Sequence, residues 1–414
     1  MQDQQDIGWQ KMQAVRIRIY GEFWDSQLAG GRLVLFGRAG DIRVLDWDRV
    51  VEDLPVEERL KSELIWTCCR NDALYKSRAG LGNPGSEVWG LLRDKFDGLS
   101  ASTLDVSPTS QISHLLSQSD NRFPFPHRDS AMAGRRLYVL SQKGLHGSRS
   151  SSGGVGTFGP PVRLADVGGF AVRPKSESLA IAAGDDGLFE FDPNHERRRT
   201  RDGLSQLTDQ NCIDCGWTYW TIYGSSFKTS GYLISSRREL SRNPKRILPS
   251  ESAGQFSRKP ELKAIYARSR REPLFLREEA IFKERGYSWG TQDSICQVEG
   301  DTVRIVRYSP RARTQSRMLH DMGVIQIAGW KGDILSGRVA LFGIIIECEE
   351  ALVLKLSSGE VLTLPGEIVR FRTFPESRRY ENQMHVVYED RLEIFAFTHD
   401  YFVSQRDKKL GYRL

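Results

Sequence analysis

The feature that most constrains the fold of this chain is a recurring pair of short alternating strands joined by a glycine-containing turn. The clearest copy covers residues 179–192, where two apolar, alternating runs flank the turn Gly-Asp-Asp-Gly at 184–187. Gly and Asp tolerate the positive φ angles that a tight hairpin turn requires, and alternation with a period of two is the pattern of a β-strand. A further strand is predicted just upstream, at residues 168–174. The segment therefore predicts three strands in succession.

Similar units recur along most of the chain. They occupy residues 15–20, 32–47, 136–145, 216–235, 293–308, 338–364 and 368–397. Setting aside two stretches without the pattern, residues 50–130 and 236–286, leaves 282 of the 414 residues, which is about seven units at the ~40-residue period of propeller blades. Short strands at regular spacing with Gly-rich turns are typical of a sandwich, a barrel or a propeller. The count favours a β-propeller of about seven blades, with six larger blades as an alternative.

The rhythm of these units resembles that of the WD40-like propellers, and the resemblance covers most of the chain. The run Asp46-Trp47-Asp48 is a single instance of their Trp-Asp signature, and regular Gly-His and Trp-Asp signatures are otherwise lacking. The resemblance implies an all-β propeller with helical insertions in one domain over residues 1–414, and no functional residue is carried over from it. Because a closed ring leaves no exposed sheet edge, we expect residues 15–20 to pair with residues 391–397.

The first stretch without the repeat pattern is predicted to contain helices. Val56, Leu60 and Leu64 fall on one face of a helix that begins near a proline. A second helix is predicted over residues 87–96, whereas the Ser-, Pro- and Asn-rich residues 100–130 are predicted to be irregular. The apolar face of the first helix is expected either to pack on a blade or to bind a partner.

The second stretch without the pattern, residues 236–286, concentrates the positive charge of the protein. It holds fourteen Lys or Arg against seven Glu, while the whole chain has a net charge of +6, so the remainder is close to neutral. Prolines divide it into pieces, of which residues 261–271 and 276–284 are predicted to be helical. Basic residues interspersed with aromatic ones are typical of nucleic-acid contact, and a solvated or protein-docking insertion is the other interpretation. The candidate binding residues are Arg237, Arg238, Lys245, Arg246, Arg258, Lys259, Arg268, Arg270 and Arg271.

Sequence patterns that would indicate catalysis or a cofactor are lacking. Cys212 and Cys215 have the spacing of a zinc knuckle or a redox pair, but no second such pair supplies the two further ligands that zinc requires. The seven histidines form no local metal-binding motif, and hairpin geometry explains Asp185 and Asp186 without a calcium ion. We predict no catalytic residue, no cofactor and no metal, with zinc or redox chemistry at the cysteine pair as the alternative.

The remaining features of the composition suggest a reducing compartment and no membrane partner. The sequence has no run of about eighteen apolar residues, and its start lacks the basic and then apolar order of a signal peptide. Six cysteines in 414 residues do not form a disulfide framework. We expect a cytoplasmic, non-enzymatic propeller scaffold or sensor subunit with protein partners, in a bacterial multiprotein complex such as a defence system. The alternative is a nucleic-acid-binding accessory subunit that uses the basic stretch, and a hydrolase or lyase with its site in a central channel ranks last.

Overall fold

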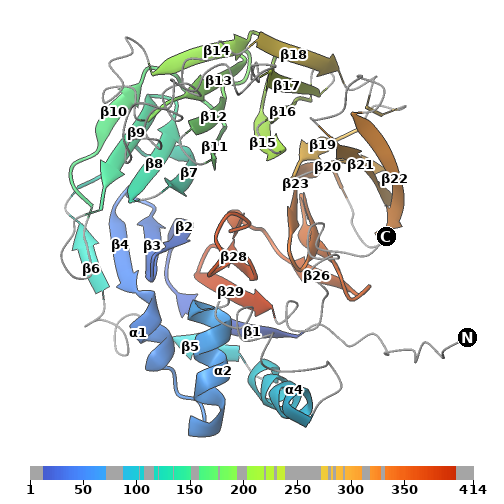
Figure 1. The fold of residues 1–414 in the computed structure, drawn as a ribbon. Helices are drawn as coiled ribbons and strands as arrows, with labels where there is room; N and C mark the ends of the chain where they lie inside the picture. The colour runs from blue at the N-terminus through green and yellow to red at the C-terminus, as the bar shows by residue number, and fades with distance from the viewer. Residues whose placement is uncertain are drawn as a thin grey trace, which may run out of the picture.

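Seven β-sheets surround a common centre in the computed structural model (Figure 1). The model describes residues 13–70, 87–101, 103–106, 116–119, 121–133, 135–150, 158–175, 178–193, 203–218, 221–227, 231–237, 272–277, 281–282, 286–291, 294–309, 318–327 and 332–397. Six sheets have four strands and the seventh has five. The chain is therefore folded as a seven-bladed β-propeller, which confirms the prediction.

Each of the first six blades runs from an inner strand at the centre to an outer strand at the rim. Blades 1 to 3 are β2 (Phe23–Ala29), β3 (Arg32–Gly37), β4 (Ile42–Asp46) and β6 (Leu116–Ser119); β7 (His127–Ala133), β8 (Arg136–Ser141), β9 (Gly144–Arg149) and β10 (Val162–Ala165); and β11 (Ala171–Lys175), β12 (Ser178–Ala182), β13 (Leu188–Phe191) and β14 (Leu204–Thr208). Blades 4 to 6 are β15 (Asp214–Thr218), β16 (Thr221–Ser225), β17 (Tyr232–Arg237) and β18 (Glu272–Arg277); β19 (Ser288–Gly290), β20 (Ser294–Glu299), β21 (Thr302–Tyr308) and β22 (Leu319–Gln326); and β23 (Ile334–Ala340), β24 (Gly343–Cys348), β25 (Ala351–Leu356) and β26 (Val361–Pro365).

Blade 7 joins the two ends of the described chain. Its strands are β27 (Arg370–Thr373), β28 (Gln383–Val387), β29 (Arg391–Phe397), β1 (Ala14–Tyr20) and β5 (Thr103–Val106). β1 pairs antiparallel with β29 along its whole length, and Ile17 lies opposite Ile394, both fully buried. The predicted pairing of residues 15–20 with residues 391–397 is confirmed. Because this pairing closes the ring, the first and last blades are not left with open edges.

Strand β12 shows why the repeat units read as apolar on both faces. Leu179 and Ile181 point toward blade 2, where they share a core with Leu140. Ala180 shares the next core with Trp217 of blade 4. Each blade is thus sandwiched between two neighbours, so that both faces of its middle strands are removed from water. Full burial of one such aliphatic side chain contributes roughly 1.5–3 kcal/mol.

The hairpin at residues 179–192 is present as predicted. Its strands β12 and β13 pair in antiparallel register, with Ala182 opposite Leu188. Gly187 in the turn has a φ of 92°, and a Cβ at this position would lie only 2.0 Å from the carbonyl oxygen of Thr208. The position therefore requires glycine for both its backbone angle and its space. Asp185 in the same turn accepts a hydrogen bond of 2.8 Å from the side-chain amide of Asn211.

The first insertion interrupts blade 1 between β4 and β6, and its described residues include three helices. These are α1 (Trp47–Glu52), α2 (Glu58–Cys69) and α4 (Glu87–Ser100). Leu60 and Leu64 are buried in a core shared with β1 and β29, whereas Val56 precedes α2 and packs against that core only partly buried. Both predicted helices are confirmed, and the first helix packs on a blade. None of the described helices is long and apolar enough to cross a membrane.

The prediction that residues 100–130 are irregular is wrong at three places. β5 pairs in parallel with β1, β6 pairs with β4 as the outer strand of blade 1, and β7 begins at His127. The polar composition of β5 and β6 suits outer positions that keep one edge in water. Partners distant in sequence, rather than local apolar alternation, make these residues strands.

The prediction of a helix over residues 276–284 is also wrong. Leu276 belongs to strand β18, where it lies opposite Leu233 of β17, and residues 281–282 are not helical. Pro273 is accommodated because β18 is the outermost strand, so its missing N–H falls at a sheet edge. The other predicted helix of this stretch, at residues 261–271, lies outside the described residues.

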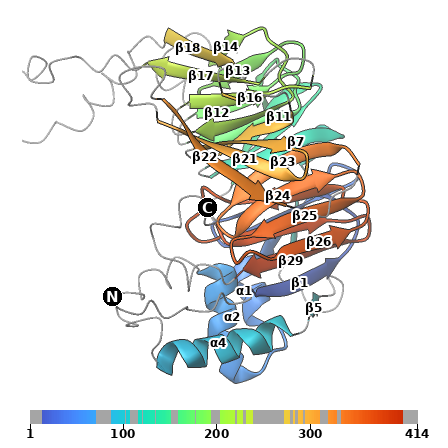
Figure 2. The ribbon, with the colours of Figure 1, turned by 90° about the vertical axis from the view of Figure 1, so that its right-hand side faces the viewer.

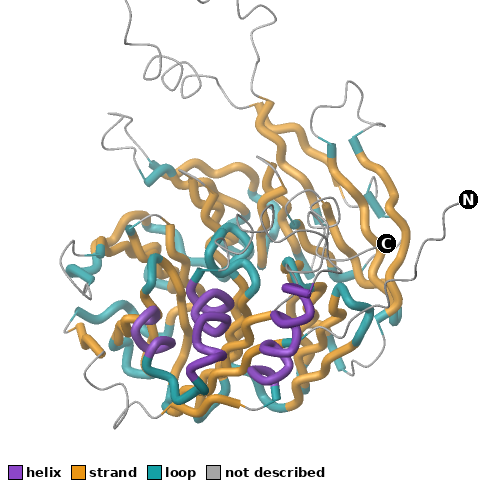
Figure 3. Tube along the Cα trace, turned by 60° about the horizontal axis from the view of Figure 1, so that its bottom comes forward, coloured by secondary structure: helices purple, strands orange, loops and turns teal. Residues whose placement is uncertain are grey.

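The longest connections leave the ring on one face. Strands alternate in direction within a blade, so the connections between first and second strands and between third and fourth strands emerge on the same side. The four longest, residues 47–115, 150–161, 192–203 and 238–271, all join third to fourth strands. We call this side the insertion face; α1, α2 and α4 mark it in Figures 2 and 3. The other side, formed by the remaining connections, is called the opposite face.

Candidate functional site

The predicted basic binding residues lie almost entirely outside the described residues. Arg237, at the end of β17, is the one that is described, and its backbone lies opposite Glu272 at the start of β18. Arg238, Lys245, Arg246, Arg258, Lys259, Arg268, Arg270 and Arg271 all fall in the connection between these two strands. The connection begins and ends on the insertion face, at the rim of blade 4. The basic patch itself stays a prediction.

A different group of charged residues meets at the centre of the ring. We call it the inner belt, and it consists of Asp25 on β2, Asp129 on β7, Arg173 on β11, Asp214 on β15, Arg338 on β23, and Arg370 and Arg372 on β27. The inner strands of all blades converge at the centre of a propeller, so residues far apart in the sequence become neighbours there. The belt draws on six of the seven blades.

Arg372 connects blades 7, 1 and 2. Its guanidinium donates to both carboxylate oxygens of Asp25, at 2.7 and 2.5 Å, and to Oδ1 of Asp129 at 2.5 Å. Asp25 is fully buried and also accepts a 2.6 Å hydrogen bond from Ser130 Oγ. Two parallel N–H···O bonds fix both the distance and the orientation of an Arg–carboxylate pair. This contact therefore holds three blades in a defined arrangement.

Arg173 continues the belt to blades 3, 4 and 6. It donates through Nη1 to Asp129, and through Nη2 to Oδ1 of Asp214 at 2.9 Å. Arg338 donates to the other oxygen of Asp214 at 2.5 Å. Positive and negative side chains thus alternate in one continuous series of ion pairs from blade 1 to blade 6.

The charges of the belt keep one another ionised. Burial would raise the pKa of Asp25, but the charge of Arg372 and the hydrogen bond from His127 outweigh it, so this pKa lies well below its ordinary value. The pKa of Asp129 is likewise lowered, against its burial, by Arg173 and Arg372. Removing one partner from a buried ion pair costs about 3–5 kcal/mol. The belt therefore makes the ring sensitive to the loss of an arginine that donates to a buried carboxylate, such as Arg372 or Arg173.

Two contacts beside the belt pair a serine hydroxyl with a carboxylate or a histidine, as catalytic sites do, but these residues are buried. Ser130 Oγ donates to Asp25 rather than to a histidine. Ser26 Oγ lies 2.9 Å from Nδ1 of His385, and both residues are fully buried. Burial also lowers the pKa of His385 to about 3. Because no substrate can reach these hydroxyl groups in the closed ring, we interpret both contacts as structural.

The C-terminal end of α2 is fixed by side-chain donors from elsewhere in the chain. The carbonyl oxygen of Cys68 accepts hydrogen bonds from Trp47 Nε1 at 2.9 Å and from Gln383 Nε2 at 2.6 Å. The carbonyl oxygen of Thr67 accepts one from Asn382 Nδ2 at 3.1 Å. Carbonyls in the last turn of a helix have no partner within the helix. Asn382 and Gln383 therefore attach the helical insertion to blade 7, the blade that closes the ring.

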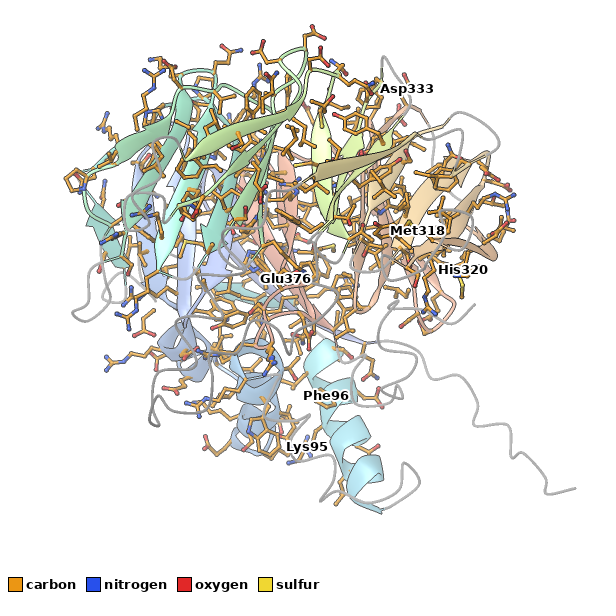
Figure 4. All side chains as sticks on the ribbon, turned by 45° about the horizontal axis from the view of Figure 1, so that its top comes forward. Lys95, Phe96, Met318, His320, Asp333 and Glu376 are labelled. Atoms are coloured by element: carbon orange, nitrogen blue, oxygen red, sulfur yellow. The ribbon has the colours of Figure 1, made fainter. Side chains whose placement is uncertain are left out.

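A loop of blade 7 spans the centre of the ring on the insertion face. Glu376, in the connection between β27 and β28, lies near the middle of the ring in Figure 4, whereas Lys95 and Phe96 mark α4 below the blades. Glu376 Oε1 accepts a 2.8 Å hydrogen bond from Nζ of Lys175 at the end of β11. Blades 7 and 3 are not neighbours, so this contact crosses from one side of the ring to the other.

The cysteine pair is buried and protonated. Burial raises the pKa of Cys212 to about 12 and that of Cys215 well above its ordinary value. Cys212 Sγ donates to the carbonyl oxygen of Asp214 at 3.2 Å. Thiolates, not thiols, bind metals and react as nucleophiles. Within the described part of the chain, no three His, Cys, Asp or Glu side chains converge as a metal site.

The chain is similar to solved propellers in fold only. No protein-family model matches it, and no curated protein matches its sequence. The chain has the β-propeller fold. BamB from Moraxella catarrhalis is 7% identical with a TM-score of 0.37, and the match covers 89% of this chain and 82% of that one. A chain of the mitotic checkpoint complex is 8% identical with a TM-score of 0.41, and the match covers 69% of this chain and 78% of that one. KlHsv2 with loop 6CD replaced by a Gly-Ser linker is 9% identical with a TM-score of 0.36, and the match covers 63% of this chain and 74% of that one. The blade number rests on the sheet topology alone.

The inner belt was not predicted from the sequence, although a signal for it exists there. The dipeptide Asp-Ser occurs at positions 25–26 and 129–130, in both cases with Asp as the third residue of an inner strand, whereas the third copy, at positions 293–294, stands at the start of β20. A charged residue in the middle of a short strand that is otherwise buried indicates a buried ion pair. The identity of the arginine partner could not be read from the sequence, because Arg372 lies 347 positions from Asp25.

Proposed function

We propose that the chain is a non-enzymatic scaffold or sensor subunit that binds a protein partner through its insertion face. The observation that carries this proposal is that the four longest connections all leave and re-enter the blades on that face. Binding specificity on a propeller resides in surfaces added to a rigid frame. The inner belt and the closure of blade 7 supply the frame, and the helices and the basic stretch supply the added surface.

An exposed aromatic side chain on this face offers a contact for the partner. Trp66 on α2 is 38% exposed although its helix packs on the ring through Leu60 and Leu64. A large aromatic residue held on a docked helix offers contact area at low cost in conformational entropy. We infer that Trp66 belongs to the partner surface.

The proposed setting is the bacterial cytoplasm, in a multiprotein complex of which defence systems are one class. All six cysteines are free and buried, which supports a reducing compartment because disulfides are rare there. We further propose that residues 1–414 act as one domain, whose two insertions lie within residues 50–130 and 236–286 apart from the blade strands β6, β7, β17 and β18. The class of complex rests on the organisation of the chain as a propeller with large insertions.

The proposal is tested with two exposed aromatic positions on different faces. Trp66→Glu should abolish co-purification of a stoichiometric partner from the native host and leave the melting temperature unchanged. Phe227, which is 63% exposed in a connection of the opposite face, serves as the matched control, and Phe227→Glu should retain the partner. Loss of the partner in the Phe227 variant alone would overturn the proposal.

The second candidate function is nucleic-acid binding by the basic stretch, which its charge of fourteen basic against seven acidic residues favours. Each phosphate contact adds to the dependence of affinity on salt. Neutralising Arg268, Arg270 and Arg271 should therefore flatten the salt slope for RNA or DNA retention. Neutralising Arg16 and Lys143, which lie outside this stretch, should change the slope less per charge removed. No retention at ~50 mM salt would eliminate this candidate.

A further inference from the structure

The inner belt contains more positive than negative charge. Four arginines face three aspartates, so the residues of the belt alone carry a net charge of +1. His127 and His385 do not alter this balance, because burial lowers the pKa of both. A buried charge without a counter-ion costs several kcal/mol. We therefore ask which arginine of the belt has the weakest contact with a carboxylate.

That arginine is Arg370. Its Nη1 lies 3.8 Å from Oδ1 of Asp129, which is beyond hydrogen-bond distance, and donates instead to the carbonyl oxygen of Arg128 at 2.8 Å. Its Nε is buried with no hydrogen-bond partner. The charge of Glu347 on blade 6 attracts Arg370. Glu347 accepts a hydrogen bond from Ser336, and no described ion pair joins Glu347 to Arg370.

The belt carboxylates cannot supply the missing acceptor, because they are already occupied. Asp25 accepts hydrogen bonds from Arg372, from Ser130 and from the backbone N–H of Ser26. Asp129 accepts hydrogen bonds from the backbone N–H groups of Ser130 and Val172 and from the side chains of Arg173 and Arg372. Asp214 accepts hydrogen bonds from the backbone N–H of Cys215 and from the side chains of Arg173 and Arg338. No aspartate of the belt is therefore left free for a fourth arginine. Burial and the charge of Arg372 lower the pKa of Arg370, and the opposing attraction of Asp25, Asp129 and Glu347 does not outweigh them.

Arg128 adds a second unpaired guanidinium at the same end of the ring. It is exposed, lies over the ring of Phe170 at 5.7 Å, and no described carboxylate forms an ion pair with it. Arg128 and Arg370 stand at the starts of β7 and β27, where these inner strands enter from the opposite face. The planar fork of N–H donors on a guanidinium matches two oxygens of a carboxylate or a phosphate.

We propose that the centre of the opposite face binds an anionic group, a carboxylate or a phosphate, through Arg370 and Arg128. The bound group supplies the counter-charge that the belt lacks. The site lies on the side of the ring away from the proposed protein-docking surface, so either proposal can fail without the other.

The proposal is tested by thermal unfolding of the full chain, with inorganic phosphate or acetate replacing chloride at constant ionic strength. The melting temperature of the wild type should rise with the concentration of the bound anion. Arg370→Met should need at least about tenfold more of that anion for the same rise in melting temperature, because this is the loss of affinity expected when one charge-assisted hydrogen bond is removed. Arg38→Met, which removes an exposed arginine paired with Glu389 on the same face, should keep the wild-type response and so corrects for general salt effects. The larger of the two responses identifies the anion as phosphate or carboxylate.

The stability of the variants in chloride gives a second readout. Arg370→Met should be at least as stable as the wild type, because it removes an uncompensated charge, whereas Arg372→Met should be much less stable. Two results would overturn the proposal. One is an identical anion response in the wild type and Arg370→Met, and the other is a loss of stability in Arg370→Met as large as in Arg372→Met.

Discussion

Replacing Arg372 by methionine should destabilise the protein by about 3–5 kcal/mol, because the change leaves a buried carboxylate without its charged partner. Methionine occupies a comparable volume, so the loss reports the charge rather than a cavity. Asp129 keeps its ion pair with Arg173 in this variant. Asp25, which is fully buried, keeps only uncharged hydrogen-bond donors such as His127. Most of the cost should therefore fall on Asp25.

The free energy of unfolding is measured by urea titration followed by circular dichroism. The control is Arg38→Met, whose exposed pair with Glu389 should contribute less than about 1 kcal/mol. Adding Asp25→Asn to Arg372→Met removes the orphaned charge and should restore part of the lost stability, which a double-mutant cycle quantifies. Equal losses for Arg372→Met and Arg38→Met would refute the conclusion that the belt is a buried, mutually dependent set of ion pairs.

Three further predictions concern stability. Leu60→Asp places an unpaired charge in the core shared by α2 and blade 7 and should lower the unfolding free energy by more than about 3 kcal/mol, whereas normal thermal stability would show that the helix does not pack there. The free energy of unfolding should fall as pH decreases from 6.5 toward 3, because His385 stays neutral in the folded protein but binds a proton in the unfolded chain. His385→Gln should reduce this slope by up to about 1.4 kcal/mol per pH unit. An unchanged slope would contradict the burial of His385 in the ring. Asn382→Leu should reduce hydrogen-exchange protection of α2 while β12 stays protected, and an unaltered α2 would argue against docking through its terminal carbonyls.

The sequence predicts those parts of the fold that depend on local patterns. The hairpin around Gly187, the strand at residues 15–20 and the helix that contains Leu60 each carry their own periodicity or turn chemistry. Closure of the ring was also predictable, because an open propeller would expose two sheet edges.

The parts that the sequence could not predict depend on partners far along the chain. β5 and β6 are short and polar, and they become strands only because β1 and β4 offer free edges. Pro273 suggests a break, yet it is tolerated in β18 because that strand is outermost. The inner belt needs residues from six blades, and the Arg372–Asp129 contact joins positions 243 residues apart. No local pattern encodes which arginine meets which aspartate.

The claim that the insertion face binds a protein partner is tested most directly by cross-linking mass spectrometry of the complex isolated from its native host. Lys61 on α2 and Lys95 on α4 lie on that face, and Lys143 lies in a turn of the opposite face. The account predicts partner cross-links at Lys61 and Lys95 and none at Lys143. Partner cross-links at Lys143 without any at Lys61 or Lys95 would contradict it.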